Sequence, residues 1–279
     1  MSLLWINGTL VEKNQARISP FDHGFLYGDG VWEPLRIFNG KLFLPREHLQ
    51  NLYHSAEKLH IEIPLTEAEL LSAIETTLKA NERVDGYVRV IVTRGPGTLG
   101  PDPRKIDPQV IIIAEEYHPF PSELYNHGLN AVSFAAAIDS SDPLVLAKTL
   151  GQPYVTVAKR QALQNGCLEA IIANQNGDIF STTEGAVLLV RDEAVFFAGG
   201  QRPDVTGNRV AGLAGEMGLI VAECRIRLPE LLLAEEVFQA GTACGVIGIV
   251  RVDGKPIGNG NEGPVTRTIR EEYEKLTKG

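Results

Sequence analysis

The sequence has little of what marks several common classes of protein. Its 279 residues include only three cysteines, Cys167, Cys224 and Cys244, an odd number without the spacing of a zinc site. We therefore expect neither a disulfide framework nor a bound metal. No stretch approaches the roughly 18 apolar residues of a membrane-spanning helix, and the start lacks a basic segment followed by an apolar core. We expect a cytoplasmic protein.

Positive charge is also scarce. Lysine and arginine number 26 against 35 aspartates and glutamates, a formal net charge of −9, and no long run of like charges occurs. Phosphate backbones and anionic lipids attract basic patches, so we expect neither nucleic acid nor a membrane as partner. With 44% hydrophobic residues, the chain is long enough for one large domain or two modest ones.

Hydrophobic periodicity predicts a mixture of strands and helices. Strands are expected near 3–6, 9–12, 33–38, 86–94, 109–115, 129–137, 168–173, 179–182, 186–190 and 194–198, and helices near 46–59, 66–81, 150–165, 207–219, 228–234 and 263–277. The order lacks the regular alternation of a doubly wound sheet. We expect an α+β protein with a cleft between two domains, 1–118 and 128–279, joined by a proline-containing connection at 119–127.

One lysine stands out as a candidate nucleophile. Lys148, in DPLVLAKTLGQPY, follows a short apolar run, precedes a predicted helix and has no carboxylate within several residues. A lysine amine in a partly apolar cleft loses its proton more readily and can attack a carbonyl carbon. From the residues alone, an ordinary surface lysine remains the alternative.

Two short stretches are able to hold an anion through backbone amides. The segment 204–209 leads into a predicted helix, and the segment 241–245 forms a glycine-containing turn between two strands. The glycine-rich turn at 94–103 lacks the lysine of a nucleotide phosphate loop. Ordinary capping threonines and glycine turns remain the alternative interpretation.

The first half of the chain offers weaker candidates. Tyr87 and Arg89 fall on one face of a predicted strand and could bind a carboxylate, although a solvated sheet face explains them equally well. Asp22, His23 and His48 form no triad by spacing, and no G-x-S-x-G turn is present, so a serine hydrolase is not favoured.

Taken together, these segments resemble the class IV, fold-type IV pyridoxal-phosphate aminotransferases. The resemblance spans nearly the whole chain and rests on SPFDHGFLYGDGVWEPLRIFNGKLF, YVRVIVTRGPGTLGPDPRK, AKTLGQPYVTVAKRQALQNGCLEAI and EEVFQAGTACGVIGIVRVDGKPIG. This family includes branched-chain and D-amino-acid aminotransferases, with aminodeoxychorismate lyase as a relative. The first-domain segments are most similar to the branched-chain group. The resemblance implies the two-domain fold-type IV architecture.

The resemblance also implies residue roles. Lys148 matches the lysine that forms a Schiff base with pyridoxal 5'-phosphate. Leu99 and Pro101 stand where the D-amino-acid enzymes have an arginine and a histidine, which favours the branched-chain interpretation. The matching cofactor-phosphate positions are Val205, Thr206, Thr242 and Ala243, and the matching substrate positions are Tyr27, Arg36, Tyr87 and Arg89.

The chain departs from the family pattern at two cofactor contacts. Asn51 stands where the family has a phosphate-binding arginine, and Ser181 where it has a glutamate on the pyridine nitrogen. Glu184 could replace that glutamate only if the strand slipped by three residues, which would reverse its inward-facing side chains. We therefore expect weaker cofactor binding and a weaker electron sink.

These observations predict a homodimeric enzyme that transfers an amino group between a small, branched-chain-like amino acid and 2-oxoglutarate, with altered efficiency. Two alternatives stay open. One is a lyase of the aminodeoxychorismate type, and the other is a weakened or cofactor-deficient relative that only binds a ligand.

Overall fold

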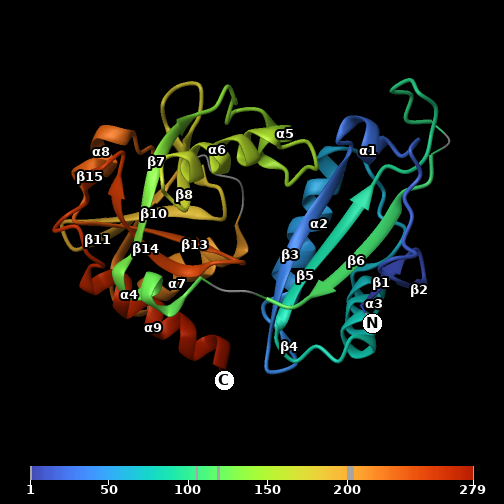
Figure 1. Ribbon diagram of the computed structural model, residues 1–279, viewed down its shortest axis with the longest axis horizontal. Coiled ribbons are helices and arrows are strands. Elements are labelled where there is room, and N and C mark those ends of the chain that lie inside the picture. Colours follow the sequence, from blue (N-terminus) through green and yellow to red (C-terminus); the bar gives the residue numbers. More distant parts are fainter. Residues whose placement is uncertain (1, 105, 118–119, 200–203, 279) are drawn as a thin grey trace. The chain divides into compact units, whose positions relative to one another are not determined.

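The computed structural model describes residues 2–104, 106–117, 120–199 and 204–278, and these form two compact units (Figure 1). The first comprises Met1–His118 and Leu146–Gln152, and the second comprises Pro119–Val145 and Pro153–Gly279. Both mix helices with a sheet, which confirms the expected α+β class. The expected boundary between residues 118 and 119 lies outside the described residues. The segment 146–152, expected in the C-terminal domain, packs in the first unit.

The first unit is built on a six-stranded antiparallel sheet. Its order is β2-β1-β6-β5-β3-β4. The strands are β1 (Leu3–Ile6), β2 (Thr9–Glu12), β3 (Gly30–Phe38), β4 (Lys41–Leu42), β5 (Gly86–Thr93) and β6 (Gln109–Glu115), and a short helix, α1 (His23–Tyr27), precedes β3.

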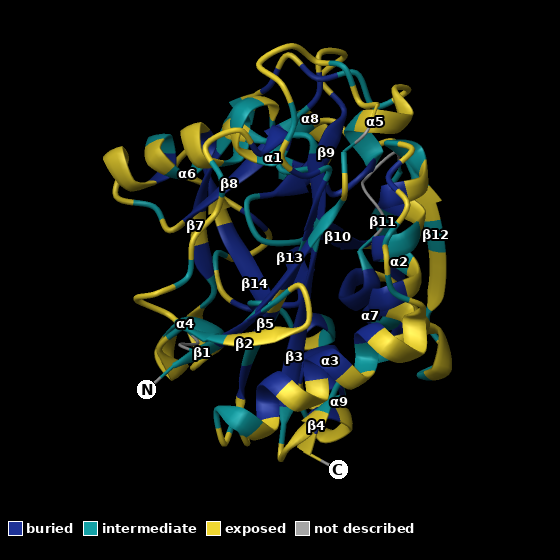
Figure 2. Cartoon of the chain, turned by 90° about the vertical axis from the view of Figure 1, so that its right-hand side faces the viewer, coloured by how far each residue is buried: buried dark blue, intermediate teal, exposed yellow. Residues whose placement is uncertain are grey.

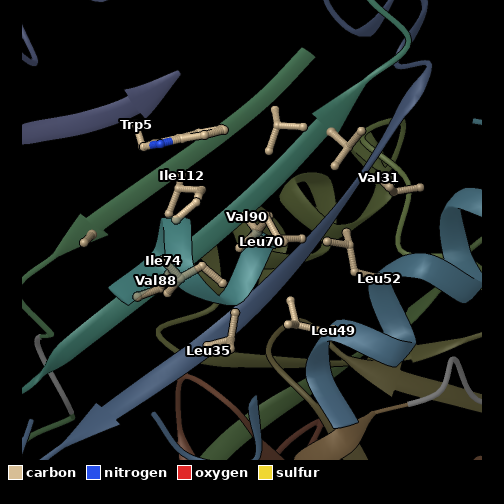
Figure 3. Packing of buried hydrophobic residues seen from close by; sticks show 14 of the residues in the cluster. Trp5, Val31, Leu35, Leu49, Leu52, Leu70, Ile74, Val88, Val90 and Ile112 are labelled. Atoms are coloured by element: carbon tan, nitrogen blue, oxygen red, sulfur yellow. The ribbon is translucent and has the colours of Figure 1, made fainter. Parts of the chain in front are cut away.

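Two longer helices, α2 (Pro45–Lys58) and α3 (Glu67–Ala80), cover one face of this sheet (Figure 3). Pro45 begins α2, where its missing amide hydrogen costs nothing, and Thr66 and Glu69 close α3 with reciprocal capping bonds. The buried core between sheet and helices includes Val31, Leu35, Leu49, Leu52, Leu70, Ile74, Val88, Val90 and Ile112.

Strand alternation sends the remaining side chains of β3 and β5 to the opposite face. On β3 these are Trp32, Pro34 and Arg36, and the register sets them against Ile91, Arg89 and Tyr87 of β5. We call this surface the open face of the first sheet, because α2 and α3 lie on the other side. It carries aromatic rings and guanidinium groups instead of a core.

The second unit contains a nine-stranded sheet. The order is β12-β11-β10-β13-β14-β7-β8-β9, and β15 pairs with β14. The strands are β7 (Leu129–Ala135), β8 (Glu169–Ala173), β9 (Ile179–Thr182), β10 (Ala186–Arg191), β11 (Ala194–Ala198), β12 (Ile220–Cys224), β13 (Glu236–Gly241), β14 (Gly245–Val252) and β15 (Lys255–Pro256). The terminal strand β9 contacts β10, so the sheet curls around its own apolar core.

The central strands of this sheet are the most buried part of the unit. Figure 2 shows β13 and β14 buried along most of their length, whereas the edge strand β12 is largely exposed. The surrounding helices are α4 (Ser122–His127), α5 (Pro143–Leu146), α6 (Pro153–Gln164), α7 (Val205–Glu216), α8 (Leu228–Leu232) and α9 (Pro264–Lys278). The helix α4 falls in the segment that the sequence predicts as a connection.

The C-terminal helix α9 is fastened to β13 by a buried carboxylate. Glu236 accepts hydrogen bonds from the amides of Val265 (3.0 Å) and Thr266 (2.7 Å) and from the Thr266 hydroxyl (2.7 Å). A negative charge at a helix N-terminus is favourable, because the first amides there have no partner within the helix. Gly263 makes this approach possible, since a Cβ there would lie 2.0 Å from the Glu236 carboxyl carbon.

Within the described part of the chain, no helix is both long enough and apolar enough to span a bilayer.

Candidate active site

The backbone around Lys148 is docked on the edge of β3. The Trp32 amide donates to the Lys148 carbonyl (2.9 Å), and the Leu150 amide donates to the Gly30 carbonyl (2.9 Å). This edge is open because β4 pairs only with the last two residues of β3. The lysine backbone therefore rests on the rigid first sheet, although the sequence places it between two helices of the second unit.

The Lys148 amine is buried against a carboxylate. Lys148 is 6% exposed, and its Nζ lies 3.1 Å from Oε1 of Glu33, which is fully buried. His48 Nδ1 donates to the same oxygen (2.8 Å), and Asn51 Nδ2 donates to Oε2 (2.9 Å). The Lys148 amide donates to Ser55 Oγ (3.3 Å). We call Glu33, His48, Asn51 and Lys148 the lysine cluster.

Two members of this cluster, Glu33 and His48, are absent from the predicted site. A usable signal was present: Glu33 occupies an inward position of β3, where its neighbours on that face, Val31 and Leu35, are core residues. A glutamate on such a face requires polar partners. The structure places the Asn51 amide on this glutamate, and its expected role at the cofactor phosphate stays a prediction.

Tyr87 and Arg89, both expected at the substrate, lie together on the open face of the first sheet. Arg89 Nη2 donates to the Tyr87 hydroxyl (3.3 Å), and the guanidinium carbon lies 4.2 Å from the centre of the Trp32 ring. The indole in turn donates to the Thr149 carbonyl (3.1 Å), next to Lys148. Stacking and hydrogen bonding therefore hold the Arg89 guanidinium on β5, the neighbour of the strand β3 on which the Lys148 segment is docked.

The other two expected substrate residues have different surroundings. Arg36 shares the open face, but its Nε donates to the Gly86 carbonyl (3.0 Å), and its guanidinium carbon lies 3.4 Å from the centre of the Tyr117 ring. Tyr27 ends α1, and its hydroxyl donates to the Leu99 carbonyl in the 94–103 loop. Arg36 lies opposite Tyr87 in the strand register, whereas Tyr27 lies against the 94–103 loop. The substrate roles of both residues stay predictions.

The second unit gathers the four expected phosphate-binding residues. Val205 and Thr206 form the first turn of α7, and Thr242 and Ala243 form the turn between β13 and β14. The Thr206 and Thr242 hydroxyls lie 3.1 Å apart, and both residues are buried. Asp204 caps the helix by accepting from the Gly207 amide (2.7 Å). Two hydroxyls at a helix N-terminus are a suitable arrangement for an anion.

Ser181 lies within β9, where it is paired with Ile172 of β8. It is 6% exposed, and its Oγ has no hydrogen-bond partner among the described residues. Glu184 lies beyond the end of the strand, and its carboxylate pairs with Lys159 Nζ (2.7 Å). A buried hydroxyl without a partner is costly, so Ser181 is suited to a polar group of a bound molecule.

Glu169 holds the turn that follows Ser181. Its Oε1 accepts from the amides of Ala170 (2.8 Å) and Thr183 (3.0 Å) and from the Thr183 hydroxyl, whereas Oε2 has no partner among the described residues. Burial is the largest influence on this carboxyl, and it raises the pKa of Glu169. Glu169 therefore joins β8 to the turn after β9.

Comparison with known proteins identifies the family of this chain. The model of the amino-transferase class IV family matches residues 30–252. A putative branched-chain-amino-acid aminotransferase of Methanocaldococcus jannaschii is 34% identical over 98% of this chain and 96% of its own length. D-alanine aminotransferase of Bacillus licheniformis is 31% identical over 95% of this chain and 93% of its own length. The chain therefore belongs to the class IV aminotransferases, and it is an aminotransferase.

Solved structures show the same fold. The crystal structure of the T.th. branched-chain amino acid aminotransferase with pyridoxamine 5'-phosphate has a TM-score of 0.95 and 28% sequence identity, and it covers all of this chain and 94% of its own. The Escherichia coli branched-chain amino acid aminotransferase gives a TM-score of 0.93 at 27% identity, covering 100% and 95%. The expected fold-type IV architecture is confirmed.

Replacing Glu169 with glutamine is expected to change how stability depends on pH. The pKa of Glu169 is raised in the folded protein, so the folded state binds this proton more tightly than the unfolded state does. The resulting stabilisation is complete below the ordinary glutamate pKa of about 4.3, and it is lost as the pH rises through the pKa of the folded protein. The glutamine keeps an acceptor at Oε1 and carries no charge. Wild type should therefore lose unfolding free energy relative to Glu169→Gln as the pH rises, by about 1.4 kcal/mol for each unit by which the pKa is raised.

Urea unfolding of both proteins between pH 4.5 and 8 measures this difference. Glu271→Gln, on the exposed side of α9, is the matched control and should follow the wild-type profile. A constant difference between wild type and Glu169→Gln across this range would contradict the assignment.

Proposed function

We propose that this aminotransferase uses pyridoxal 5'-phosphate to move an amino group between a small, branched-chain-like amino acid and 2-oxoglutarate. The observation that carries the proposal is the Lys148 amine, buried 3.1 Å from Glu33 in the first unit. A buried amine on a rigid strand edge can bind an aldehyde covalently and then serve as a general base. Membership of the class IV family supports that use.

The residues present fit the cofactor. The Thr206 and Thr242 hydroxyls with the first amides of α7 form an anion cup for its phosphate. The unpartnered Ser181 hydroxyl is a buried polar atom that the pyridine nitrogen would satisfy. Lys148 provides the amine for its aldehyde. When bound, pyridoxal phosphate supplies the electron sink for the pair left behind as the α-proton of an amino acid departs.

The open face of the first sheet supports the proposed substrate class. Arg89, fixed by Tyr87 and Trp32, offers a cation to a carboxylate, and a dicarboxylate such as 2-oxoglutarate supplies one beyond the reacting end. Leu99 stands where the D-amino-acid enzymes have an arginine, and it is 70% exposed. This supports the branched-chain assignment. Lys148 Nζ would take the proton from the α-carbon of the substrate and would then deliver it to the cofactor carbon.

We also propose that the enzyme is a homodimer. Large apolar side chains are exposed at α1, just before it and on the 94–103 loop, and they include Phe21 (48%), Phe25 (73%) and Leu99 (70%). The segments are tied together, because the Gly97 amide donates to the Phe21 carbonyl (3.0 Å). Exposed apolar patches of this kind mark association surfaces, and a second copy is the occupant we propose.

Incubation of the purified protein with pyridoxal phosphate, L-leucine and 2-oxoglutarate tests the proposed activity. We expect visible absorbance from the bound cofactor, formation of glutamate and 4-methyl-2-oxopentanoate, and after borohydride a mass increase on Lys148. Lys148→Ala should lose the adduct and nearly all activity, because the covalent link and the base are removed together. Release of many equivalents of oxo acid per enzyme without 2-oxoglutarate would show that the amino group is set free instead of transferred, and an unmodified Lys148 would refute the proposal.

The serine at position 181 should slow the reaction. A hydroxyl cannot keep the pyridine nitrogen protonated at neutral pH, whereas a carboxylate can, and protonation strengthens the sink. Ser181→Glu is therefore expected to raise the half-reaction rate with L-leucine by about tenfold, or about 1.4 kcal/mol of barrier. Stopped-flow absorbance measures the rate, with Ser181→Ala as the control without a carboxylate. No gain in Ser181→Glu, with the lysine adduct intact, would count against this role.

The asparagine at position 51 should weaken cofactor binding. Loss of a charged phosphate contact costs about 1.5–3 kcal/mol, which corresponds to roughly tenfold to hundredfold in Kd. We expect Asn51→Arg to tighten the binding of pyridoxal phosphate by such a factor, measured by equilibrium dialysis. Asn51→Gln controls for side-chain length without charge, and an arginine variant with the wild-type Kd would exclude this explanation.

A further inference from the structure

Glu33, a buried carboxylate, is not among the site residues expected from the sequence. Its side chain is 0% exposed and lies among the core residues of the first sheet. A buried carboxylate is tolerated only when donors surround it. Among the described residues, Glu33 has three such donors: Lys148 Nζ, His48 Nδ1 and Asn51 Nδ2.

The three donors differ in the charge that they can bring to Glu33. Asn51 is neutral, and it stands at the position where the resemblance has an arginine. His48 is buried, and its other ring nitrogen, Nε2, has no partner among the described residues. The contact of His48 with Glu33 is made through Nδ1. A proton taken up by Lys148 places a full positive charge 3.1 Å from Glu33 Oε1.

We propose that Glu33 is a positioning residue that stabilises the ammonium form of Lys148 during the proton transfer. This inference rests on the proposed function. When Lys148 Nζ takes the α-proton, the substrate C–H bond breaks, an N–H bond forms, and the electron pair stays with the substrate and cofactor. The new positive charge on Nζ forms beside Glu33 Oε1, which is held in place by His48 and Asn51. The arrangement parallels a carboxylate that stabilises the imidazolium of a catalytic histidine.

The variant Glu33→Gln removes the charge while keeping the hydrogen bonds. The glutamine oxygen can still accept from Lys148 and His48, which share Oε1. Its amide can donate to the Asn51 oxygen after that side chain turns over, because the two ends of an asparagine amide are interchangeable in shape. We therefore expect this variant to fold.

The first experiment uses the protein without cofactor. Lysines are labelled with acetic anhydride at neutral pH, and mass spectrometry gives the rate at Lys148 relative to the exposed Lys41. Only the uncharged amine reacts, so loss of the carboxylate should speed labelling of Lys148 in Glu33→Gln by about tenfold, the ratio between a charged and a neutral hydrogen bond. Glu75→Gln, on the exposed side of α3, should label like wild type. An unchanged rate at Lys148 would overturn the proposal.

A second variant keeps the test decisive if Glu33→Gln does not fold. In the cofactor-free protein used for labelling, no phosphate competes for the arginine of Asn51→Arg, so it places a second cation at Glu33, where Asn51 Nδ2 now donates. The Lys148 ammonium then loses part of its stabilisation, and its labelling should also accelerate. Slower or unchanged labelling in a folded Asn51→Arg protein would contradict the proposal, because it would mean that the lysine does not depend on the charge of Glu33.

The third measurement addresses the proton transfer itself. With the amino acid that wild type converts fastest, Glu33→Gln should lower kcat by at least about tenfold with little change in KM, and the isotope effect of the α-deuterated substrate should increase. A structural defect alone would reduce cofactor occupancy without changing the isotope effect, and that result would refute the role. Failure of the proposed substrate class is a separate outcome, because the labelling result requires neither cofactor nor amino acid.

Discussion

The ion pair between Lys148 and Glu33 is the constraint on which the rest of the first unit depends. A fully buried carboxylate destabilises a fold unless donors reach it, and here the donors come from α2 and from the segment 146–152. The segment is thus bound to the first sheet by charge as well as by the β3 edge. Removing Lys148 would leave a buried carboxylate with the His48 and Asn51 donors alone, and breaking a buried charge pair is destabilising. The same contact fixes the amine that is proposed as the nucleophile.

Strand alternation lets β3 serve two purposes at once. Its inward side chains build the core and present Glu33 to the helices, and its outward side chains present Trp32 to the open face, where Arg89 stacks on it. The lysine segment touches both sets, since its amine meets Glu33 and its carbonyls accept from Trp32. The strand β3 therefore contacts both the lysine segment and, through Trp32, the arginine expected to bind substrate carboxylate.

Most of the elements could be predicted from the sequence, because their apolar spacing is strong. The strands of the first sheet other than the two-residue β4, and the helices α2 and α3, follow directly from periodicity. The position of the segment 146–152 could not be predicted, because nothing local distinguishes a loop that returns to an earlier strand from one that continues onward. The pairing of Glu33 with His48 was missed because it depends on how α2 packs on β3 and joins residues 15 apart in the chain. The one local signal was a glutamate at an inward position of β3.

The two departures from the family pattern act on opposite charges. Asn51 stands in place of a positively charged residue, and Ser181 in place of a negatively charged one. The net formal charge of the residues expected at the cofactor is therefore unchanged, although neither of these two residues is charged. In the first unit, Asn51 donates to Glu33 Oε2 through a neutral amide (2.9 Å). In the second unit, the Ser181 hydroxyl is buried without a partner among the residues that the structure describes. The proposed function therefore depends on the Lys148 amine and on the adjoining hydroxyls of Thr206 and Thr242, with neutral side chains at the two positions where the resemblance has charged ones.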